Sequence, residues 1–357
     1  MQCAQHPQGR PDAKPGRTVA SAAQRGQLAL GTVEDWLVYN LTGGAHVTDA
    51  SNASRTLLLP LAGASWDPAL CDLFGVPLAA LGDVVDNAGQ FGTARADLLG
   101  HAVPITGLAG DQQSATIGQG CLSPGETKAT YGTGAFVLAN MGQTVPRSGN
   151  RLLGTVLCQL GGQRSYALEG SVFVAGSLIK WLRDSLGLIA NAAESEALAR
   201  SVADSGGVTV VPALAGLGAP HWRPEARGVI TGLTFASTRA HIARAALEAM
   251  AMQTQDLARA FAADGAEWTA LKIDGGMSAN DWMAQDLANV LQVPVERPHF
   301  VETTALGAAM LAGVGAGLFA SLEVAAAAMR GQVQTFTPGA AIDPARREGW
   351  DKALAAV

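Results

Sequence analysis

The sequence contains little charge, few cysteines and no block of basic residues. Only 15% of the 357 residues are charged, and the formal net charge is -6. Binding to nucleic acid or to an anionic membrane surface requires a basic patch, so we expect neither partner. The four cysteines lie far apart and lack the paired spacing of metal or redox sites, as is typical of reduced thiols in a cytoplasmic protein. Small-molecule chemistry is therefore the expected class of function.

A strongly apolar run of membrane-spanning length is also missing. Residues 303–322 form the longest uncharged stretch, which approaches the length of a membrane span. Glycine and alanine dominate this stretch and make it too weakly apolar for a transmembrane helix. We predict a tightly packed, buried helix followed by a turn there.

The chain is, by contrast, rich in apolar residues and glycine. Apolar residues make up 48% of the sequence, and 43 residues are glycine. This composition is typical of a globular α/β protein with many tight turns, and the length allows two domains. Residues 1–22 are the exception, because they show neither helical nor strand periodicity. We predict a disordered or non-native leader there; a targeting segment is the alternative.

Residues 107–115, of sequence Gly-Leu-Ala-Gly-Asp-Gln-Gln-Ser-Ala, carry the main chemical signal. Asp111 lies between a short β-like run and a predicted helix, and open α/β sheets place catalytic groups at such junctions. The helix N-terminus favours an ionised carboxylate, which is the state that a general base needs. Gln112 and Gln113 add amide groups that suit a hydroxyl-rich ligand. The alternative is that Asp111 only caps the helix.

Two glycine-rich turns are candidates for holding phosphate. Residues 132–134, Gly-Thr-Gly, join two β-like runs and can form a nest of N–H groups with the Thr133 hydroxyl, although such a turn is often only a turn. Gly275-Gly276 follows a predicted strand and precedes a helix predicted at 278–291, which makes an anion or nucleotide cradle. Its spacing matches neither the dinucleotide fingerprint nor the Walker loop.

These features together indicate phosphoryl transfer to an alcohol, in which positioning and charge neutralisation supply most of the catalysis. No His or Cys cluster has metal-ligand spacing, so a metal would be Mg²⁺ held largely by phosphates and a carboxylate. The polar residues 51–55 are either a solvated turn or a wall of the substrate site.

On these residues the chain resembles glycerol kinases of the FGGY carbohydrate kinase family. The resemblance runs from about residue 23 to residue 354, and its blocks follow the order and approximate spacing of the family. The blocks are residues 51–56, 107–113, 131–136, 167–170, 216–222 and 274–276. The blocks at 51–56 and 110–113 are specific to glycerol kinases, and pentulose kinases of the same family look different at both.

The resemblance implies a ribonuclease H-like, actin-like ATPase fold of the α/β class, with two domains and the active site in the cleft between them. Residues 23–121 would belong to the N-terminal, substrate-side domain and residues 122–357 to the C-terminal, nucleotide-side domain. The implied activity is the ATP-dependent phosphorylation of glycerol to sn-glycerol 3-phosphate with Mg²⁺, yielding ADP, in a cytoplasmic homo-oligomer.

The resemblance also assigns site residues. Asp111 matches the catalytic base, Gln112 a glycerol contact and Phe136 an apolar wall of the glycerol site. The positions that match ATP contacts are Thr133, Gly176, Gly276 and Asn280. Lys180 stands where glycerol kinases usually have glutamine, so the contact beside adenine departs from the family pattern.

One family feature cannot be found at the start of the sequence. The family begins with an Asp-x-Gly-Thr-x-Ser phosphate hairpin, then an Arg-Glu pair and aromatic residues that hold glycerol, and none of these occurs in residues 1–30. We therefore expect a chain that lacks most of the first domain, with little activity and a tendency to associate through exposed apolar surface. The alternatives are an active glycerol kinase, another FGGY sugar kinase, or an inactive fragment that retains only nucleotide binding.

Overall fold

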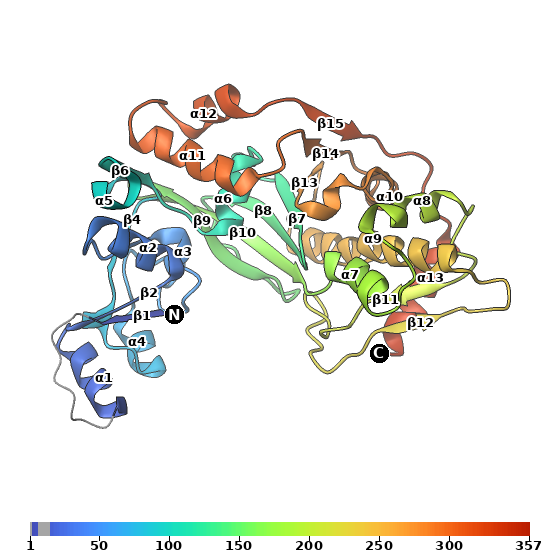
Figure 1. Ribbon diagram of the computed structural model, residues 1–357, viewed down its shortest axis with the longest axis horizontal. Coiled ribbons are helices and arrows are strands. Elements are labelled where there is room, and N and C mark those ends of the chain that lie inside the picture. Colours follow the sequence, from blue (N-terminus) through green and yellow to red (C-terminus); the bar gives the residue numbers. More distant parts are fainter. Residues whose placement is uncertain (1, 6–14) are drawn as a thin grey trace.

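The computed structural model describes residues 2–5 and 15–357, with side-chain surroundings from residue 19 onward. The elements of the first third of the chain gather at one side of the molecule, and a long sheet crosses its middle (Figure 1). The helix of residues 239–263 and the C-terminus lie at the other side (Figure 1). Within this described part of the chain, no helix combines the length and the apolar character that crossing a membrane requires.

A mixed seven-stranded sheet forms the centre of the molecule. In spatial order its strands are β15 (Val333–Phe336), β14 (Val295–Pro298), β13 (Leu271–Asp274), β7 (Thr127–Tyr131), β8 (Ala135–Gly142), β10 (Gln163–Val172) and β9 (Leu153–Leu160). Strands β7, β8, β10 and β9 pair antiparallel, whereas β13 is parallel to β7, with Asp274 beside Thr130. Because β7 and β13 run in parallel, the segments that follow them meet at one edge of the sheet.

One face of this sheet is covered by α9 (Arg239–Ala263) and the elements packed on it. They are α7 (Gly176–Asp184), α8 (Ala192–Arg200), α10 (Asp281–Leu291) and the two-stranded sheet of β11 (Thr209–Val211) and β12 (Val229–Thr231), joined by α13 (Pro344–Ala355). Many buried positions of α9 are alanines, so the helix can approach its neighbours closely. Large buried side chains fill the core between these layers, among them Tyr131, Leu247, Phe261 and Trp350.

On the other side, α6 (Asp111–Gly118) packs against α11 (Thr303–Gly315), which is followed by α12 (Leu322–Met329). The contact between α6 and α11 depends on glycine. A Cβ atom at Gly307 would lie 1.9 Å from the carbonyl oxygen of Ser114, and one at Gly118 would lie 2.0 Å from that of Thr303. The predicted helix in 303–322 is therefore confirmed, but only one of its faces is buried, since Thr304, Ala305, Ala308 and Ala309 are exposed. The small residues of the buried face serve close backbone packing.

The first third of the chain forms pairs of strands and short helices. These are β1 (Gln2–Gln5) with β2 (Leu28–Gly31), β3 (Val47–Asp49) with β4 (Asp83–Val85), β5 (Ala88–Ala94) with β6 (Val103–Gly107), and the helices α1 (Pro15–Gln24), α2 (Val33–Thr42), α3 (Ala50–Ala53), α4 (Pro68–Phe74), η1 (Leu78–Ala80) and α5 (Ala96–Leu99). No pair joins the seven-stranded sheet. This region therefore has several small apolar clusters instead of one core.

The structure differs from the sequence prediction at the leader. Residues Gln2–Gln5 form a strand paired with β2, and Pro15–Gln24 form helix α1, although we predicted disorder through residue 22. The helix forms because its alanines find a small core: Ala23 is 3% exposed and packs with Leu28 and Ala80. The remaining residues of the predicted leader, 1 and 6–14, lie outside the described residues.

Candidate active site

Asp111 is the first residue of α6, and the residue at the N-cap position is Gly110. Gly110 makes no side-chain cap, and the exposed Asp111 carboxylate accepts the N–H of the adjacent Gln112 through Oδ1, at 2.8 Å. Asp111 is therefore not the N-cap residue, but its carboxylate does accept an N–H of the first turn, so a capping role stands beside the predicted catalytic one. The carboxylate lies at the surface, beside the first turn of α6, where it can meet a ligand.

A buried polar network holds the loop that precedes Asp111. Ser51 Oγ accepts the N–H of Gly110 at 2.9 Å, and Asp49 Oδ1 accepts both the N–H of Ser51 and the amide of Asn87, each at 2.8 Å. Asn87 also donates to the carbonyl of Leu108 at 2.8 Å. Asp49, Ser51 and Asn87 are each 0% exposed. The start of the 51–55 stretch is therefore no solvated turn; it is helix α3, which supports the Asp111 loop from behind.

The two glutamines after Asp111 have different surroundings. Gln112 donates from Nε2 to Asp111 Oδ2 at 3.2 Å and accepts at Oε1 from Lys128 Nζ at 2.7 Å. Gln113 is buried, and its amide donates to Thr155 Oγ1 at 3.0 Å. Gln112 is thus the glutamine beside the carboxylate, while Gln113 fixes α6 to the sheet. Sequence analysis missed Lys128, because one lysine in a β-like run carries no motif.

The turn of residues 132–134 follows β7 and supports α7. The N–H of Gly132 is taken by the carbonyl of Gly134 at 2.9 Å, and the carbonyls of Gly132 and Thr133 accept the N–H groups of Gly176 and Ser177 at 2.9 and 3.1 Å. A Cβ atom at Gly176 would lie 2.5 Å from the carbonyl oxygen of Gly132, so a glycine is needed there. The Gly132 N–H is thus already bonded within the turn and is not available to a phosphate in the predicted nest. Thr133 itself is exposed.

The second candidate phosphate site, Gly275-Gly276, follows β13 and lies beside the turn of residues 132–134 and the start of α7. Gly275 has a φ of 84° and lies so close to the carbonyl of Tyr131 that a Cβ atom would be 2.6 Å away. Met277, one residue after Gly276, lies 3.2 Å from the position of a Cβ atom on Gly176. A Cβ atom on Gly276 would meet nothing within 4 Å. The fold therefore brings the turn at 132–134, the start of α7 and Gly276 together.

The other expected nucleotide residues are placed differently. Asn280 is the N-cap of α10, and its Oδ1 accepts the N–H of Met283 at 2.9 Å, so only its amide nitrogen is left for a ligand. The predicted helix start at Ser278 is wrong: residues Gly276–Ala279 form a 3-10 turn, and the buried Ser278 hydroxyl donates to the Gly275 carbonyl. Lys180 is exposed on α7, four residues after Gly176 and hence on the same face.

Phe136 and Asp274 complete the surroundings. Phe136 lies near the start of β8, just after the 132–134 turn, and 37% of its side chain is exposed. Asp274, at the end of β13, is 1% exposed and accepts from Gln119 Nε2 at 2.9 Å and Thr303 Oγ1 at 2.5 Å. Asp274 thereby ties the sheet to α6 and α11, and Phe136 offers an exposed apolar surface on the side of the turn.

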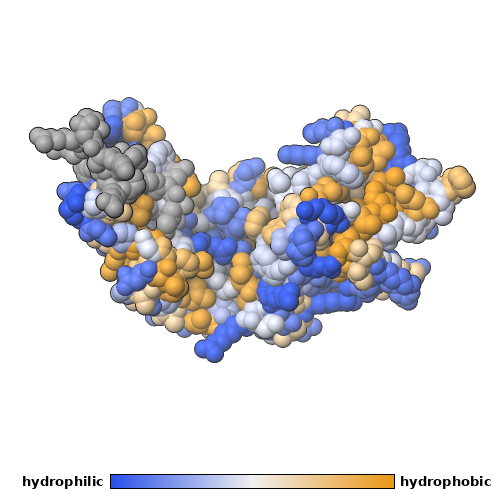
Figure 2. Space-filling view, turned by 90° about the horizontal axis from the view of Figure 1, so that it is seen from below, coloured by the Kyte–Doolittle hydropathy of each residue, from blue (hydrophilic) through white to orange (hydrophobic). Residues whose placement is uncertain are grey.

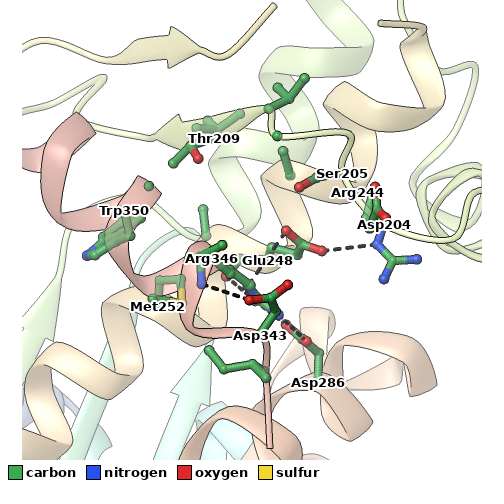
Figure 3. Close-up of a pocket in the computed structure, with 18 of the residues that line it drawn as sticks. Asp204, Ser205, Thr209, Arg244, Glu248, Met252, Asp286, Asp343, Arg346 and Trp350 are labelled. Carbon is green, nitrogen blue, oxygen red and sulfur yellow. Dashed lines mark hydrogen bonds and ion pairs between the residues drawn. The ribbon is translucent and has the colours of Figure 1, made fainter. Parts of the chain in front are cut away.

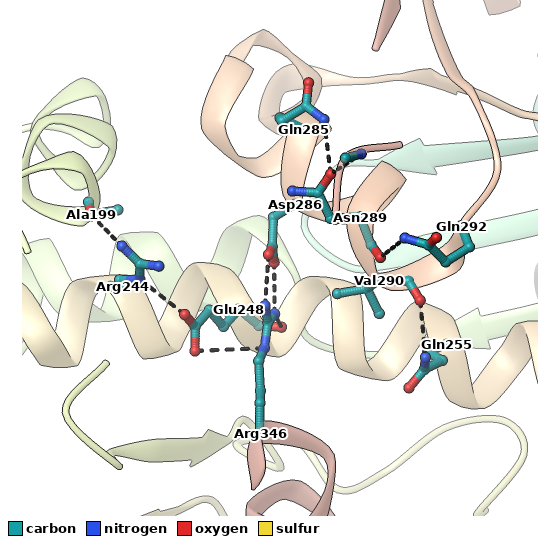
Figure 4. A network of polar contacts seen from close by, with 11 residues as sticks. Ala199, Arg244, Glu248, Gln255, Gln285, Asp286, Asn289, Val290, Gln292 and Arg346 are labelled. Atoms are coloured by element: carbon teal, nitrogen blue, oxygen red, sulfur yellow. Dashed lines mark hydrogen bonds and ion pairs between the residues drawn. The ribbon is translucent and has the colours of Figure 1, made fainter. Parts of the chain in front are cut away.

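A cavity of about 470 Å³ lies elsewhere, between α9, α10, α13 and β11, and contains none of the predicted site residues (Figure 3). Four of its charged side chains, Arg244, Glu248, Asp286 and Arg346, are paired with one another (Figure 4). Arg346 binds Asp286 through two hydrogen bonds of 2.6 and 2.7 Å, and Arg244 binds Glu248 at 3.0 Å. Arg346 also lies 3.6 Å from Glu248, so the pairs join α9, α10 and α13, and we interpret them as structural.

Two protein-family models match the parts of the chain that contain the candidate site residues. The model of the FGGY family of carbohydrate kinases, N-terminal domain, matches residues 16–118, and the C-terminal domain model matches residues 127–316. Our expectation that most of the N-terminal domain is lacking is therefore wrong, because a match to that domain begins within the predicted leader.

Individual relatives are similar over most of this chain. A glycerol kinase of Rhodospirillum rubrum is 57% identical over 84% of this chain and 61% of its own length, and one of Coxiella burnetii (strain RSA 493 / Nine Mile phase I) is 51% identical over 93% of this chain and 67% of its own length. The chain thus spans about three fifths to two thirds of these curated relatives.

Solved structures share the fold. A crystal structure of Plasmodium falciparum glycerol kinase with ADP has a TM-score of 0.88 and 34% identity, covering 96% of this chain and 69% of that one. A xylulose kinase from Brucella ovis has a TM-score of 0.82 at 24% identity, covering 95% of this chain and 71% of that one. The expected ribonuclease H-like, actin-like fold with two domains is confirmed.

Proposed function

The chain belongs to the FGGY family of carbohydrate kinases, and we propose that it transfers the γ-phosphoryl group of ATP to glycerol. The observation that carries the proposal is the Asp111 carboxylate, which is exposed at the start of α6 and held by the N–H and the side-chain amide of Gln112. The identity of 57% to a glycerol kinase supports glycerol as the acceptor.

In the proposed reaction, Asp111 accepts the proton of a glycerol hydroxyl while that oxygen attacks the γ-phosphorus. The bond from the γ-phosphorus to the bridging oxygen breaks, and ADP leaves with the electron pair. Gln112 offers its amide to the glycerol hydroxyls, and Phe136 covers the carbon chain. These roles make Asp111 the catalytic residue and the other two residues acceptor contacts.

We propose that the nucleotide lies along the edge where β7 and β13 end. Thr133, Gly176 and Gly276 come together there, and the free space at Gly276 allows phosphate oxygens to approach the backbone. Lys180 would lie on the outer part of this surface, and Asn280 would offer its amide nitrogen. Lys180 is then able to add a positive charge where relatives carry an amide.

Mg²⁺ fits this site only as an ion carried mainly by the phosphates. Among the residues that the structure describes, no group of three or more His, Cys, Asp or Glu side chains could hold a metal. When bound with ATP, the ion would neutralise phosphate charge, with the exposed Asp111 carboxylate as a candidate ligand. A cytoplasmic location and a homo-oligomeric state are further predictions from the family.

The test is a coupled assay of ADP release with glycerol, with xylulose and without an acceptor. We expect release that depends on glycerol and stays at background with xylulose. Equal release with xylulose would favour another sugar kinase of the family. ATP binding without ADP release under any condition would overturn the proposal and favour a protein that retains only nucleotide binding.

A further inference from the structure

Lys128 is a lysine with a fully buried side chain, on strand β7. Its Nζ donates to Gln112 Oε1 at 2.7 Å and to Thr130 Oγ1 at 2.8 Å. Within the described residues it forms no ion pair with a carboxylate, although burial of such a group is costly. An ion pair therefore does not explain why the Lys128 amine is buried, since its two hydrogen-bond partners are a glutamine and a threonine.

The two contacts of Gln112 fix the orientation of its amide. A lysine Nζ donates to an acceptor in this geometry, so it must face the oxygen of the amide, and an ionised carboxylate only accepts, so it must face the nitrogen. Lys128 therefore selects the Oε1 side of Gln112 and turns Nε2 toward Asp111 Oδ2, 3.2 Å away. Without the lysine, only the 3.2 Å contact with Asp111 Oδ2 would still favour this orientation of the amide.

The protonation of Lys128 does not alter this conclusion. Burial lowers the pKa of Lys128, and the nearby carboxylates of Asp274 and Glu169 oppose that shift. Even a neutral amine keeps two N–H donors, enough for both contacts. Because the side chain is 0% exposed, Lys128 itself is closed to a ligand, and it can act on the reaction only through Gln112 or through the effect of its charge on Asp111.

We propose that Lys128 is a positioning residue, which fixes the Gln112 amide and, through it, the Asp111 carboxylate in the geometry that receives the acceptor hydroxyl. This inference rests on the proposed function for its consequence in catalysis. Its geometric part concerns the protein without substrate and can be tested by itself.

The strand beside β7 offers a matched control. Lys272 of β13 is the direct cross-strand partner of Lys128, is 9% exposed, and donates to the Gly120 carbonyl at 3.1 Å and to Glu126 at 2.8 Å. Lys272→Met removes a buried lysine from the same layer without touching Gln112. Lys128→Met and Lys272→Met therefore separate positioning from general loss of stability.

The first readout is the side-chain amide signal of Gln112 in protein labelled with ¹⁵N-glutamine, assigned with Gln112→Leu. Loss of a hydrogen bond from a charged group should speed solvent exchange of this amide roughly tenfold or more in Lys128→Met, with little change in Lys272→Met. The second readout is kinetic. In Lys128→Met, kcat/KM for glycerol should fall roughly tenfold to a hundredfold, while KM for ATP stays within about twofold.

An unchanged Gln112 signal in Lys128→Met would overturn the inference, and so would equal losses for glycerol and ATP or an unchanged kcat/KM for glycerol. If the methionine variant does not fold, Lys128→Leu, which also removes the donor, replaces it with the same expected direction. A wild-type protein that releases no ADP counts against the proposed function alone, since the Gln112 signal still decides whether Lys128 holds the amide.

Discussion

The two regions of the molecule, residues 23–121 and 122–357, bury their apolar side chains in different ways. The second region has one continuous sheet with a large core around α9. Large apolar side chains are exposed in both regions, among them Leu57 and Leu73 in the first and Phe235 and Leu318 in the second. The first region has only strand pairs and small clusters. The first region is therefore less able to stabilise itself.

Residues of the first region form hydrogen bonds to the edge strand of the second region's sheet. Strand β9 is the last strand of that sheet, and its free side binds Asn87, which donates its N–H to the Gln159 carbonyl at 2.8 Å and accepts the N–H of Gln159 at 2.7 Å. The Ser54 hydroxyl accepts the N–H of Val156 at 3.2 Å. These contacts satisfy an edge that would otherwise be open to association.

The surface between the two regions is hollowed, as the space-filling view shows (Figure 2). Asp111 and Gln112 belong to the first region, whereas Thr133 and Gly276 belong to the second. We infer that a less stable region carries the acceptor chemistry and a more stable one carries the nucleotide surface. This arrangement suits an active site in which one side adjusts to the ligand.

The largest expected effect comes from separating the regions. Residues 122–357 expressed alone should unfold cooperatively on heating and bind ATP with Mg²⁺ weakly, because they contain the sheet, the α9 core and the Gly276 cradle. Residues 1–121 alone should show no cooperative transition, since the β9 edge and α11 would be missing. Circular dichroism and calorimetry measure both properties. No heat of binding at millimolar nucleotide would contradict the first expectation, and a sharp transition of 1–121 the second.

The next largest effect is chemical and confined to the first region. Asp111→Asn should lower phosphoryl transfer roughly a hundredfold or more, because an amide cannot accept the hydroxyl proton. Its thermal midpoint should stay near that of the wild type, since the asparagine oxygen can still accept the N–H of Gln112. ATP affinity, a property of the second region, should not change. Equal losses of activity and of thermal stability would show that the carboxylate is structural instead.

A third prediction separates the regions by their response to pH. Burial and the nearby Asp49 raise the pKa of Glu34 from 4.5 to about 8, and Asp35 raises the pKa of His46 above 6.5. Both groups bind protons more tightly in the folded state, so the stability they add is present at low pH and is lost as pH rises, between about 4.5 and 8 for Glu34. The equilibrium constant for opening of the first region should therefore rise by up to about tenfold per pH unit between about pH 4.5 and pH 8.

The second region should respond in the opposite direction. Burial raises the pKa of Asp256, but His221 and Arg347 outweigh it and leave that pKa below 3.8, so this stability is lost only as pH falls through the acid range. Hydrogen exchange by mass spectrometry, corrected for intrinsic rates, measures the two regions separately. Glu34→Gln should flatten the response of residues 33–49. A response of the same sign in both regions would contradict this prediction.

The sequence was enough to predict the fold class, and the structure shows why some site details could not be predicted. Asp111, Thr133 and Gly276 lie at strand-to-helix junctions or turns, where local motifs reveal position. Lys128 and Asn87 act through contacts with residues 16 and 72 positions away, and no local spacing encodes such pairs. The Ser278 helix start was wrong because Asn280 offers the cap that α10 uses. The roles assigned to Asp111, Gln112, Phe136, Thr133, Gly176, Lys180, Gly276 and Asn280 remain predictions.

The smallest expected effect tests the nucleotide surface of the second region alone. A Cβ atom on Gly276 would enter open space and the backbone there does not have the positive φ that favours glycine, so Gly276→Val should fold normally. In the complex, however, the valine methyl groups would occupy the space in which phosphate must approach the backbone, and ATP affinity should fall about tenfold. Gly331→Val is the matched control, because Gly331 also faces open space but lies in the loop before β15. Calorimetry with ATP and Mg²⁺ should separate the two variants, while their thermal midpoints stay alike. Equal affinities would mean that the phosphates do not pass Gly276, and the nucleotide would then have to be placed elsewhere along the edge of β7 and β13.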